Sequence, residues 1–301
     1  MATHPVGGAM NDSASVPRPV LFIHGLFLHA SSWGPWCRRF AEAGFAPVAP
    51  GWPGEADTVA AARATPDRVA NQGIEEVAEH FRGIVAELPA SPVLVGHSFG
   101  GLIVQKLLGE GLGHAGIAID PAQIQGVLPL PLAQLRAGWP ALGNPFNLTR
   151  AVALTRDEFR FGFGNTLSQA ESDELFETWT VPSPARPVFE AAVANFVWHA
   201  ASKVDTLNHT RGPLLLVSGS DDHTVPEITT RATFHQYRHS RAVTDLIELE
   251  GRGHSLVIDH GWSAVADAVL EWLGAKGEGE MAQAETRATN ADADRTPEES
   301  P

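Results

Sequence analysis

The sequence of 301 residues contains a single cysteine, Cys37, so no disulfide can form within the chain. Basic residues are also few: 21 lysines and arginines stand against 35 aspartates and glutamates, which gives a net charge of −14. Because no basic cluster is present, we expect no nucleic-acid partner. No apolar run reaches the length of a membrane-spanning helix, and residues 1–18 lack the apolar core of a signal peptide. We therefore expect a cytoplasmic protein that does not contact a membrane.

Apolar runs typical of buried strands alternate with helical patterns over most of the chain. The clearest helix is predicted over residues 72–88, where apolar residues recur at positions i, i+3, i+4 and i+7. Such alternation predicts an α/β fold with a mostly parallel central sheet flanked by helices, and functional residues at the carboxyl ends of the strands. The strands are expected at residues 19–23, 45–48, 93–95, 115–119, 213–217 and 243–249.

The alternation stops at Pro121, after the strand that ends near Ile119. Residues 121–211 read as short helices with many prolines, and they hold ten of the 23 aromatic residues of the chain. Because this segment interrupts the sheet on the side of the expected site, we predict a helical cap over that site. Two of its aromatic side chains, Trp139 and Phe163, are expected to influence substrate preference. The predicted domains are a disordered leader (1–17), a core (18–120 and 212–274), the cap (121–211) and a disordered acidic tail (275–301).

One stretch organises the chemistry of the chain. Gly96-His97-Ser98-Phe99-Gly100 fits the pattern G-x-S-x-G between a predicted strand and a predicted helix. A sharp strand-to-helix turn leaves no room for side chains at the two glycines and makes the serine hydroxyl project. The serine also falls at a helix N-terminus, which favours developing negative charge. Ser98 is therefore the candidate nucleophile.

A serine hydroxyl is a weak nucleophile, so it needs a base within hydrogen-bond reach and a carboxylate that orients this base. Two further loops supply these groups. Asp222 follows the strand predicted at 213–217, and His254 follows the strand predicted at 243–249. Asp120 also ends a predicted strand and stays an alternative orienting acid.

With these motifs in their order Ser98, Asp222, His254, the sequence resembles the α/β-hydrolase superfamily over roughly residues 18–274. The resemblance implies that Ser98 is the nucleophile, His254 the general base and then acid, and Asp222 the orienting acid. It also implies an oxyanion hole made by the backbone N–H groups of Leu26 and Phe99. Supporting loop positions are His24, Gly25, Gly96 and Gly100.

The function expected from these residues is a serine hydrolase that cleaves a carboxylic ester or lactone of a small, largely apolar substrate through an acyl-enzyme on Ser98. Other activities of the fold stay open: perhydrolysis of the haloperoxidase type, acyl transfer, C–C bond hydrolysis, or ligand binding by a receptor-like protein. No cofactor is expected. Although Asp221, Asp222 and His223 lie close together, the sequence has no H-E-x-x-H motif, and no metal is expected either.

Overall fold

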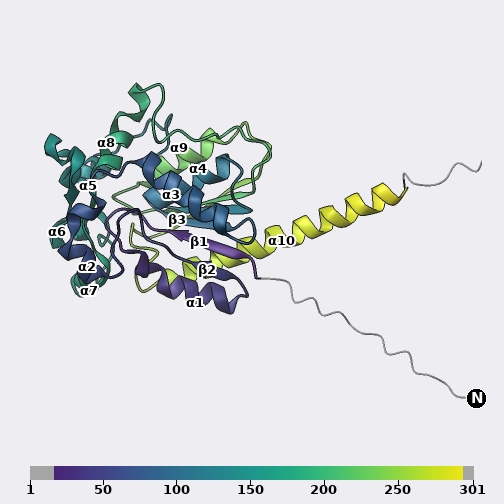
Figure 1. The fold of residues 1–301 in the computed structure, drawn as a ribbon, viewed down its shortest axis with the longest axis horizontal. Helices are drawn as coiled ribbons and strands as arrows, with labels where there is room; N and C mark the ends of the chain where they lie inside the picture. Colours follow the sequence, from purple (N-terminus) through teal and green to yellow (C-terminus); the bar gives the residue numbers. More distant parts are fainter. Residues whose placement is uncertain (1–16, 294–301) are drawn as a thin grey trace, which may run out of the picture.

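A six-stranded sheet forms the centre of the computed structural model, which describes residues 17–293 (Figure 1). Each strand runs parallel to its neighbours, in the order β2-β1-β3-β4-β7-β8. The chain leaves β1 to one side to form β2 and returns to its other side to form β3. Such a reversal opens a crevice at the carboxyl ends of the two strands, here β1 and β3. The strands are β1 (Pro19–Ile23), β2 (Ala46–Val48), β3 (Val93–His97), β4 (Ala115–Ile119), β7 (Leu214–Gly219) and β8 (Thr244–Leu249).

Helices cover both faces of the sheet, and β1 shows how the sequence achieves this. Val20 and Phe22 pack in one apolar cluster, whereas Leu21 and Ile23 pack in the other, because successive side chains of a strand point to opposite faces. Helices α1 and α10 cover the first cluster, and α3 and α4 cover the second, on the opposite side of the sheet in Figure 1. These helices are α1 (Gly34–Glu42), α3 (Ile74–Glu87), α4 (Phe99–Gly109) and α10 (Trp262–Ala293).

The predicted α/β architecture is therefore confirmed, with a parallel sheet whose interior strands are apolar on both faces. The predicted helix over residues 72–88 is α3, which buries Ile74, Val77 and Phe81. Glu75 and Glu76 lie in its first turn, where negative charge complements the helix dipole.

The segment between β4 and β7 forms four α-helices and a small two-stranded sheet, gathered at one end of the central sheet (Figure 1). It has no separate core, because Phe159, Phe163 and Leu175 belong to the same apolar cluster as the strand residues Leu21 and Ile23. Its elements are α5 (Leu132–Leu142), β5 (Ala151–Val152), α6 (Arg156–Gly162), α7 (Gln169–Trp179), β6 (Ser183–Pro184) and α8 (Arg186–Val193).

The remaining elements are α9 (Glu227–Gln236), which lies on the α3 side of the sheet, and five short helical turns. These turns are η1 (Ala30–Trp33), α2 (Val59–Ala64) and η2 (Pro66–Val69), together with η3 (Pro145–Thr149) and η4 (Ala194–Phe196) in the segment between β4 and β7.

None of the helices in residues 17–293 is both long and apolar enough to cross a membrane.

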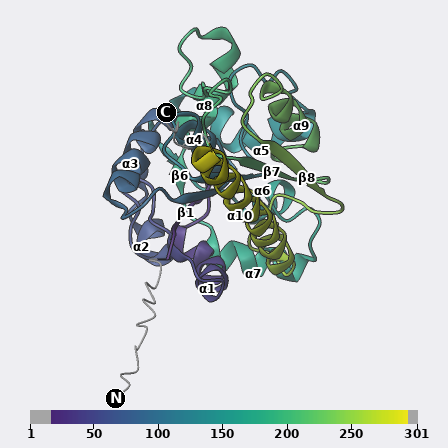
Figure 2. The same cartoon turned by 90° about the vertical axis from the view of Figure 1, so that its right-hand side faces the viewer.

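The C-terminal segment differs from its prediction. Disorder was expected from residue 275, but α10 continues to Ala293 and extends away from the rest of the molecule (Figures 1 and 2). The physical reason is composition: alanine and glutamate recur through this segment, and their high helix propensity outweighs the lack of apolar residues on which the prediction of disorder was based. Residues 294–301 and residues 1–16 of the predicted leader lie outside the described residues.

Candidate active site

Ser98 occupies a strained turn between β3 and α4. Its backbone has φ 55° and ψ −121°, a conformation that side-chain-bearing residues rarely adopt. The neighbouring glycines are required by packing. A Cβ on Gly96 would lie 2.3 Å from the carbonyl oxygen of Gly100, and a Cβ on Gly100 would lie 2.1 Å from that of Ile23. The G-x-S-x-G pattern thus follows from close backbone contacts, and it sets Ser98 directly before the first residue of α4.

His254 and Asp222 form a buried pair. The Nδ1 atom of His254 lies 2.5 Å from Oδ2 of Asp222, and both side chains are inaccessible to solvent. The other carboxylate oxygen, Oδ1, accepts hydrogen bonds from the backbone N–H groups of Thr224 (2.6 Å) and Val225 (2.8 Å). These bonds fix the carboxylate, and the carboxylate in turn fixes the orientation of the imidazole.

The free nitrogen of His254 is next to the serine turn. The His254 ring lies 4.5 Å, centroid to centroid, from the ring of His97, the residue before Ser98. Its Nε2 atom is buried and has no hydrogen-bond partner within the described residues. On its other side the ring of Phe163 meets His254 edge-on at 4.8 Å, so His254 is held between the core and the inserted helices. Nε2 is thus left available for a proton from a hydroxyl.

The loop after β1 passes directly over Ser98. A Cβ on Gly25 would lie 2.7 Å from Cβ of Ser98 and 3.4 Å from its hydroxyl oxygen. Next to this contact, Leu26 and Phe99 line the same pocket as Ser98, and no hydrogen bond is found for their backbone N–H groups in the described part of the chain. For Phe99 this follows from its place at the start of α4. Both groups can therefore serve a ligand oxygen at Ser98.

Three contacts that the sequence did not predict hold this loop. The backbone N–H of Phe27, which has a positive φ of 68°, donates to the hydroxyl of Ser183 at 2.6 Å. Further along, the N–H of His29 donates to the carbonyl of Trp179 at 3.1 Å, and Leu28 forms a β-bridge with Thr180. No short motif marks these contacts, because they join positions about 150 residues apart.

His24 has a buried partner that the sequence analysis missed. Its Nδ1 lies 2.8 Å from the carbonyl oxygen of Gly25, and its Nε2 lies 3.2 Å from Oε2 of Glu55. Burial alone would lower the pKa of His24, but the charge of the nearby Glu55 carboxylate and the contact with the Gly25 carbonyl raise it above its ordinary value. Burial likewise disfavours the charged form of Glu55, yet His24 and His29 hold the pKa of Glu55 below its ordinary value. The two residues thus form a buried ion pair behind the loop.

Asp120 is not the carboxylate at Nδ1 of His254. One of its oxygens, Oδ1, instead accepts a hydrogen bond from the backbone N–H of Gly219 at 2.8 Å. His97, Asp120 and His254 nevertheless place possible metal-ligating atoms within 4.8 Å of one another, all of them buried. The absence of a metal stays a prediction.

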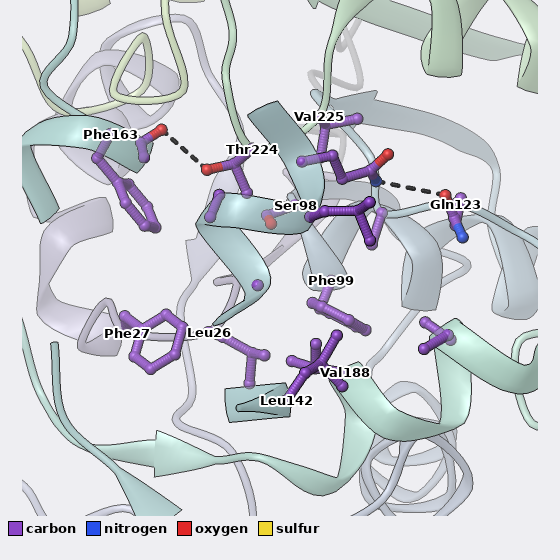
Figure 3. Close-up of a pocket in the computed structure, with 18 of the residues that line it drawn as sticks. Leu26, Phe27, Ser98, Phe99, Gln123, Leu142, Phe163, Val188, Thr224 and Val225 are labelled. Carbon is purple, nitrogen blue, oxygen red and sulfur yellow. Dashed lines mark hydrogen bonds between the residues drawn. The ribbon is translucent and has the colours of Figure 1, made fainter. Parts of the chain in front are cut away.

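An apolar pocket of about 120 Å³ opens at Ser98 (Figure 3). Phe163 lines this pocket, as its predicted role requires, whereas Trp139 is 67% exposed and is not among the lining residues. Polar groups on the wall are few: Gln123, Gln134, Glu158 and Thr224. The apolar lining side chains include Leu26, Phe27, Phe99, Leu130, Leu135, Leu142, Leu154, Phe163, Val188 and Val225.

The chain is similar to known proteins in both sequence and fold. Residues 20–268 match the model of the alpha/beta hydrolase family. No curated protein sequence is significantly similar to the chain. Several solved structures share the fold at low identity. A monoacylglycerol lipase from Paleococcus ferrophilus is 20% identical, with a TM-score of 0.60, over 86% of this chain and 95% of that one. An extracellular alpha/beta-hydrolase from a Paenibacillus species is 19% identical, with a TM-score of 0.61, over 85% and 98%. An esterase from Thermogutta terrifontis is 19% identical, with a TM-score of 0.59, over 86% and 90%.

Proposed function

The chain belongs to the alpha/beta hydrolase family, and from this premise we propose that it is a serine hydrolase that cleaves a carboxylic ester or lactone of a small, largely apolar substrate. The observation that carries the proposal is the arrangement at one end of the pocket. Ser98 lies in the strained turn, His254 is paired with Asp222 at 2.5 Å, and the adjoining cavity is apolar. Apolar walls suit the hydrocarbon part of an ester, and the ester group then lies against Ser98.

In the acylation step, the hydroxyl oxygen of Ser98 attacks the carbonyl carbon of the ester while Nε2 of His254 takes the hydroxyl proton. The carbonyl oxygen becomes an oxyanion, and the N–H groups of Leu26 and Phe99 stabilise it; one such donor is worth about 3–4 kcal/mol. His254 then returns the proton to the departing alkoxide as the C–O bond breaks. An alcohol leaves, and the acyl group stays on Ser98.

In the deacylation step, His254 takes a proton from water and the resulting hydroxide attacks the acyl carbon. The second tetrahedral intermediate uses the same two N–H groups. When it collapses, the bond to the Ser98 oxygen breaks, the proton returns from His254 to this oxygen, and a carboxylic acid is released. Asp222 stays ionised throughout and keeps the proton-bearing Nδ1 turned away from the serine. The cycle needs no cofactor.

We also propose that residues 121–211 act as a cap on the core formed by residues 18–120 and 212–274. The support is that the pocket wall is shared. Leu142 and Val188 from the inserted helices face the same cavity as Ser98 and Leu26 from the core (Figure 3). A substrate must therefore pass between the two parts, and the inserted helices exclude water from the reaction.

The test combines covalent labelling with turnover. A fluorophosphonate probe should label the wild-type protein, and a series of p-nitrophenyl esters should be hydrolysed. Ser98→Ala should lose labelling and at least about 10³-fold in kcat/KM, because no other described group replaces the nucleophile. Equal turnover by folded Ser98→Ala protein would refute the proposal. Tight ester binding without turnover by the wild type would instead indicate a receptor-like protein.

A further inference from the structure

Asp120 is a fully buried carboxyl group that the proposed mechanism does not use. It follows β4 in a strained conformation, with φ 40°. Two contacts fix it to β7: its backbone N–H donates to the carbonyl of Val217 at 2.8 Å, and its Oδ1 accepts from the N–H of Gly219 at 2.8 Å. Since Gly219 ends β7 three residues before Asp222, these contacts hold Asp120 beside the turn that carries the orienting acid. Backbone strain and a buried carboxyl group both cost stability, so their presence beside the orienting acid indicates a function.

The two carboxyl groups differ in what they accept. Asp222 accepts three hydrogen bonds, from the backbone of Thr224 and Val225 and from His254. The structure gives Asp120 one acceptor contact, and its Oδ2 is buried without a donor in residues 17–293. A carboxylate that accepts several donors is stabilised in its charged form, whereas a buried oxygen without a donor favours the protonated acid. This difference in donors favours the protonated form at Asp120.

No neighbouring cation is free to stabilise a charged Asp120. The titratable groups that act on Asp120 are His97, His254, Asp222 and Arg252. His97 is buried, and burial together with the nearby His254 holds its pKa well below the ordinary value, so it is neutral. Arg252 is paired with Asp259 at 2.5 Å. Burial, then the charge of Asp222, raises the pKa of Asp120 well above its ordinary value, although the hydrogen bond from Gly219 and the charge of Arg252 act in the opposite direction.

We propose that Asp120 is a positioning residue, which donates a hydrogen bond from a protonated Oδ2 to the carboxylate of Asp222. This contact restrains the Asp222 carboxylate in addition to its two backbone donors, so that Oδ2 of Asp222 keeps facing Nδ1 of His254. Asp120 thus acts on the reaction through Asp222 and touches no reacting atom. The inference rests on the proposed function, because the role of Asp222 comes from the serine hydrolase mechanism.

Asparagine and alanine at position 120 separate this role from its alternatives. Asn can accept from the Gly219 N–H through its oxygen and donate to Asp222 through its amide, so it reproduces both bonds without an ionisable proton. We expect Asp120→Asn to keep kcat within about threefold of wild type, with the acid limb of the pH–rate profile unchanged. Asp120→Ala should lose about tenfold or more in kcat with little change in KM, because Asp222 and His254 lose their restraint. Asp221→Asn is the matched control, since this neighbouring carboxylate is exposed and should have no effect.

A charged Asp120 would give the opposite result. Its replacement by Asn would then remove a negative charge beside His254, move the acid limb by about one pH unit or more to lower pH, and reduce kcat. That result overturns the proposal, as does an Asp120→Ala variant with wild-type kcat.

A readout that does not depend on turnover separates this proposal from the proposed function. The ¹H NMR resonance of the Nδ1 proton of His254 should be the same in wild type and Asp120→Asn and shifted or lost in folded Asp120→Ala. An unchanged resonance in all three proteins refutes the role of Asp120. If Ser98→Ala hydrolyses esters like wild type, only the proposed function fails, and the NMR comparison still decides the role of Asp120.

Discussion

Replacing Glu55 with glutamine should destabilise the protein, and the loss should grow as the pH falls. Glu55 and His24 lie 3.2 Å apart, and both side chains are at least 94% buried. At this distance and an effective dielectric constant of about 20, the Coulomb attraction is about 5 kcal/mol, which the cost of burying both charges largely offsets. Glu55 also accepts a hydrogen bond from the N–H of Ala30 at 3.1 Å, which glutamine can still accept.

The size of the effect depends on what His24 does without its partner. A charged His24 left unpaired would cost about 3–5 kcal/mol, but the ring can lose its proton instead. Near pH 7 this release costs almost nothing, because the ordinary pKa of histidine is 6.5. What remains is the loss of the close polar contact between the carboxylate and the buried Nε2 of His24, which costs about 2 kcal/mol of unfolding free energy.

The sign of the pH dependence follows from the two pKa shifts. The raised pKa of His24 contributes stability that is complete below 6.5 and is lost as the pH rises through the higher folded-state value. The lowered pKa of Glu55 contributes stability that is complete above 4.5 and is lost as the pH falls through its folded-state value. The wild type therefore gains most between pH 4.5 and 6.5. In Glu55→Gln, His24 is neutral when folded but protonated when unfolded at pH 5.5, which adds about 1.4 kcal/mol to the loss there.

Urea unfolding at pH 7.5 and pH 5.5 tests this prediction. The difference between wild type and Glu55→Gln should rise from about 2 to about 3–4 kcal/mol on acidification. Glu250→Gln is the control, because this carboxylate is exposed and should change stability by less than about 0.5 kcal/mol at either pH. A loss that is equal at both pH values, or that shrinks at pH 5.5, would show that His24 and Glu55 are not an ion pair.

Three further predictions concern the pocket, the acid and the C-terminal helix. Asp222→Asn should lower kcat by roughly 10⁴-fold in an ester assay, because His254 is then held in the wrong tautomer; residual activity near that of wild type would contradict its role. Phe163→Ala should shift the preferred acyl chain length in a p-nitrophenyl ester series, whereas Trp139→Ala should not, since only Phe163 lines the pocket; equal shifts in both would argue against this pocket. Deleting residues 278–301 should cost less than about 1 kcal/mol in urea unfolding, because the cut leaves Val269 and Trp272 of the apolar cluster in place and Lys276 keeps its ion pair with Asp245; a large loss would show that the deleted part docks.

Much of the fold was predictable because its signals are local. Short apolar runs and the periodicity of α3 depend on neighbouring residues, and the runs placed the strands of the parallel sheet within a few positions. The serine turn was equally predictable from the sequence, because backbone contacts on either side of Ser98 require glycine at positions 96 and 100.

The supporting contacts of the site were not predictable in the same way. Glu55 meets His24 across a distance of 31 residues, and Asp120 meets Gly219 across 99, so no spacing pattern links them. Which aromatic side chains line the pocket depends on how the inserted helices pack against the core. The sequence could therefore not show that Phe163 faces the cavity and Trp139 faces solvent. The helical continuation of α10 was missed because the prediction weighed apolar content above helix propensity.

The hydrogen bond between Phe27 and Ser183 has a consequence for protein engineering. Exchanging the insertion for that of another family member is an obvious route to a new substrate preference. Such a chimera would also remove Ser183 and the strand partner of Leu28 at Thr180, which anchor the loop bearing Leu26. The segment from Trp179 to Ser183 therefore supports the core loop, although it lies in the insertion. A graft should leave this segment in place. The exchanged part can then change substrate specificity without loosening the loop beside Ser98.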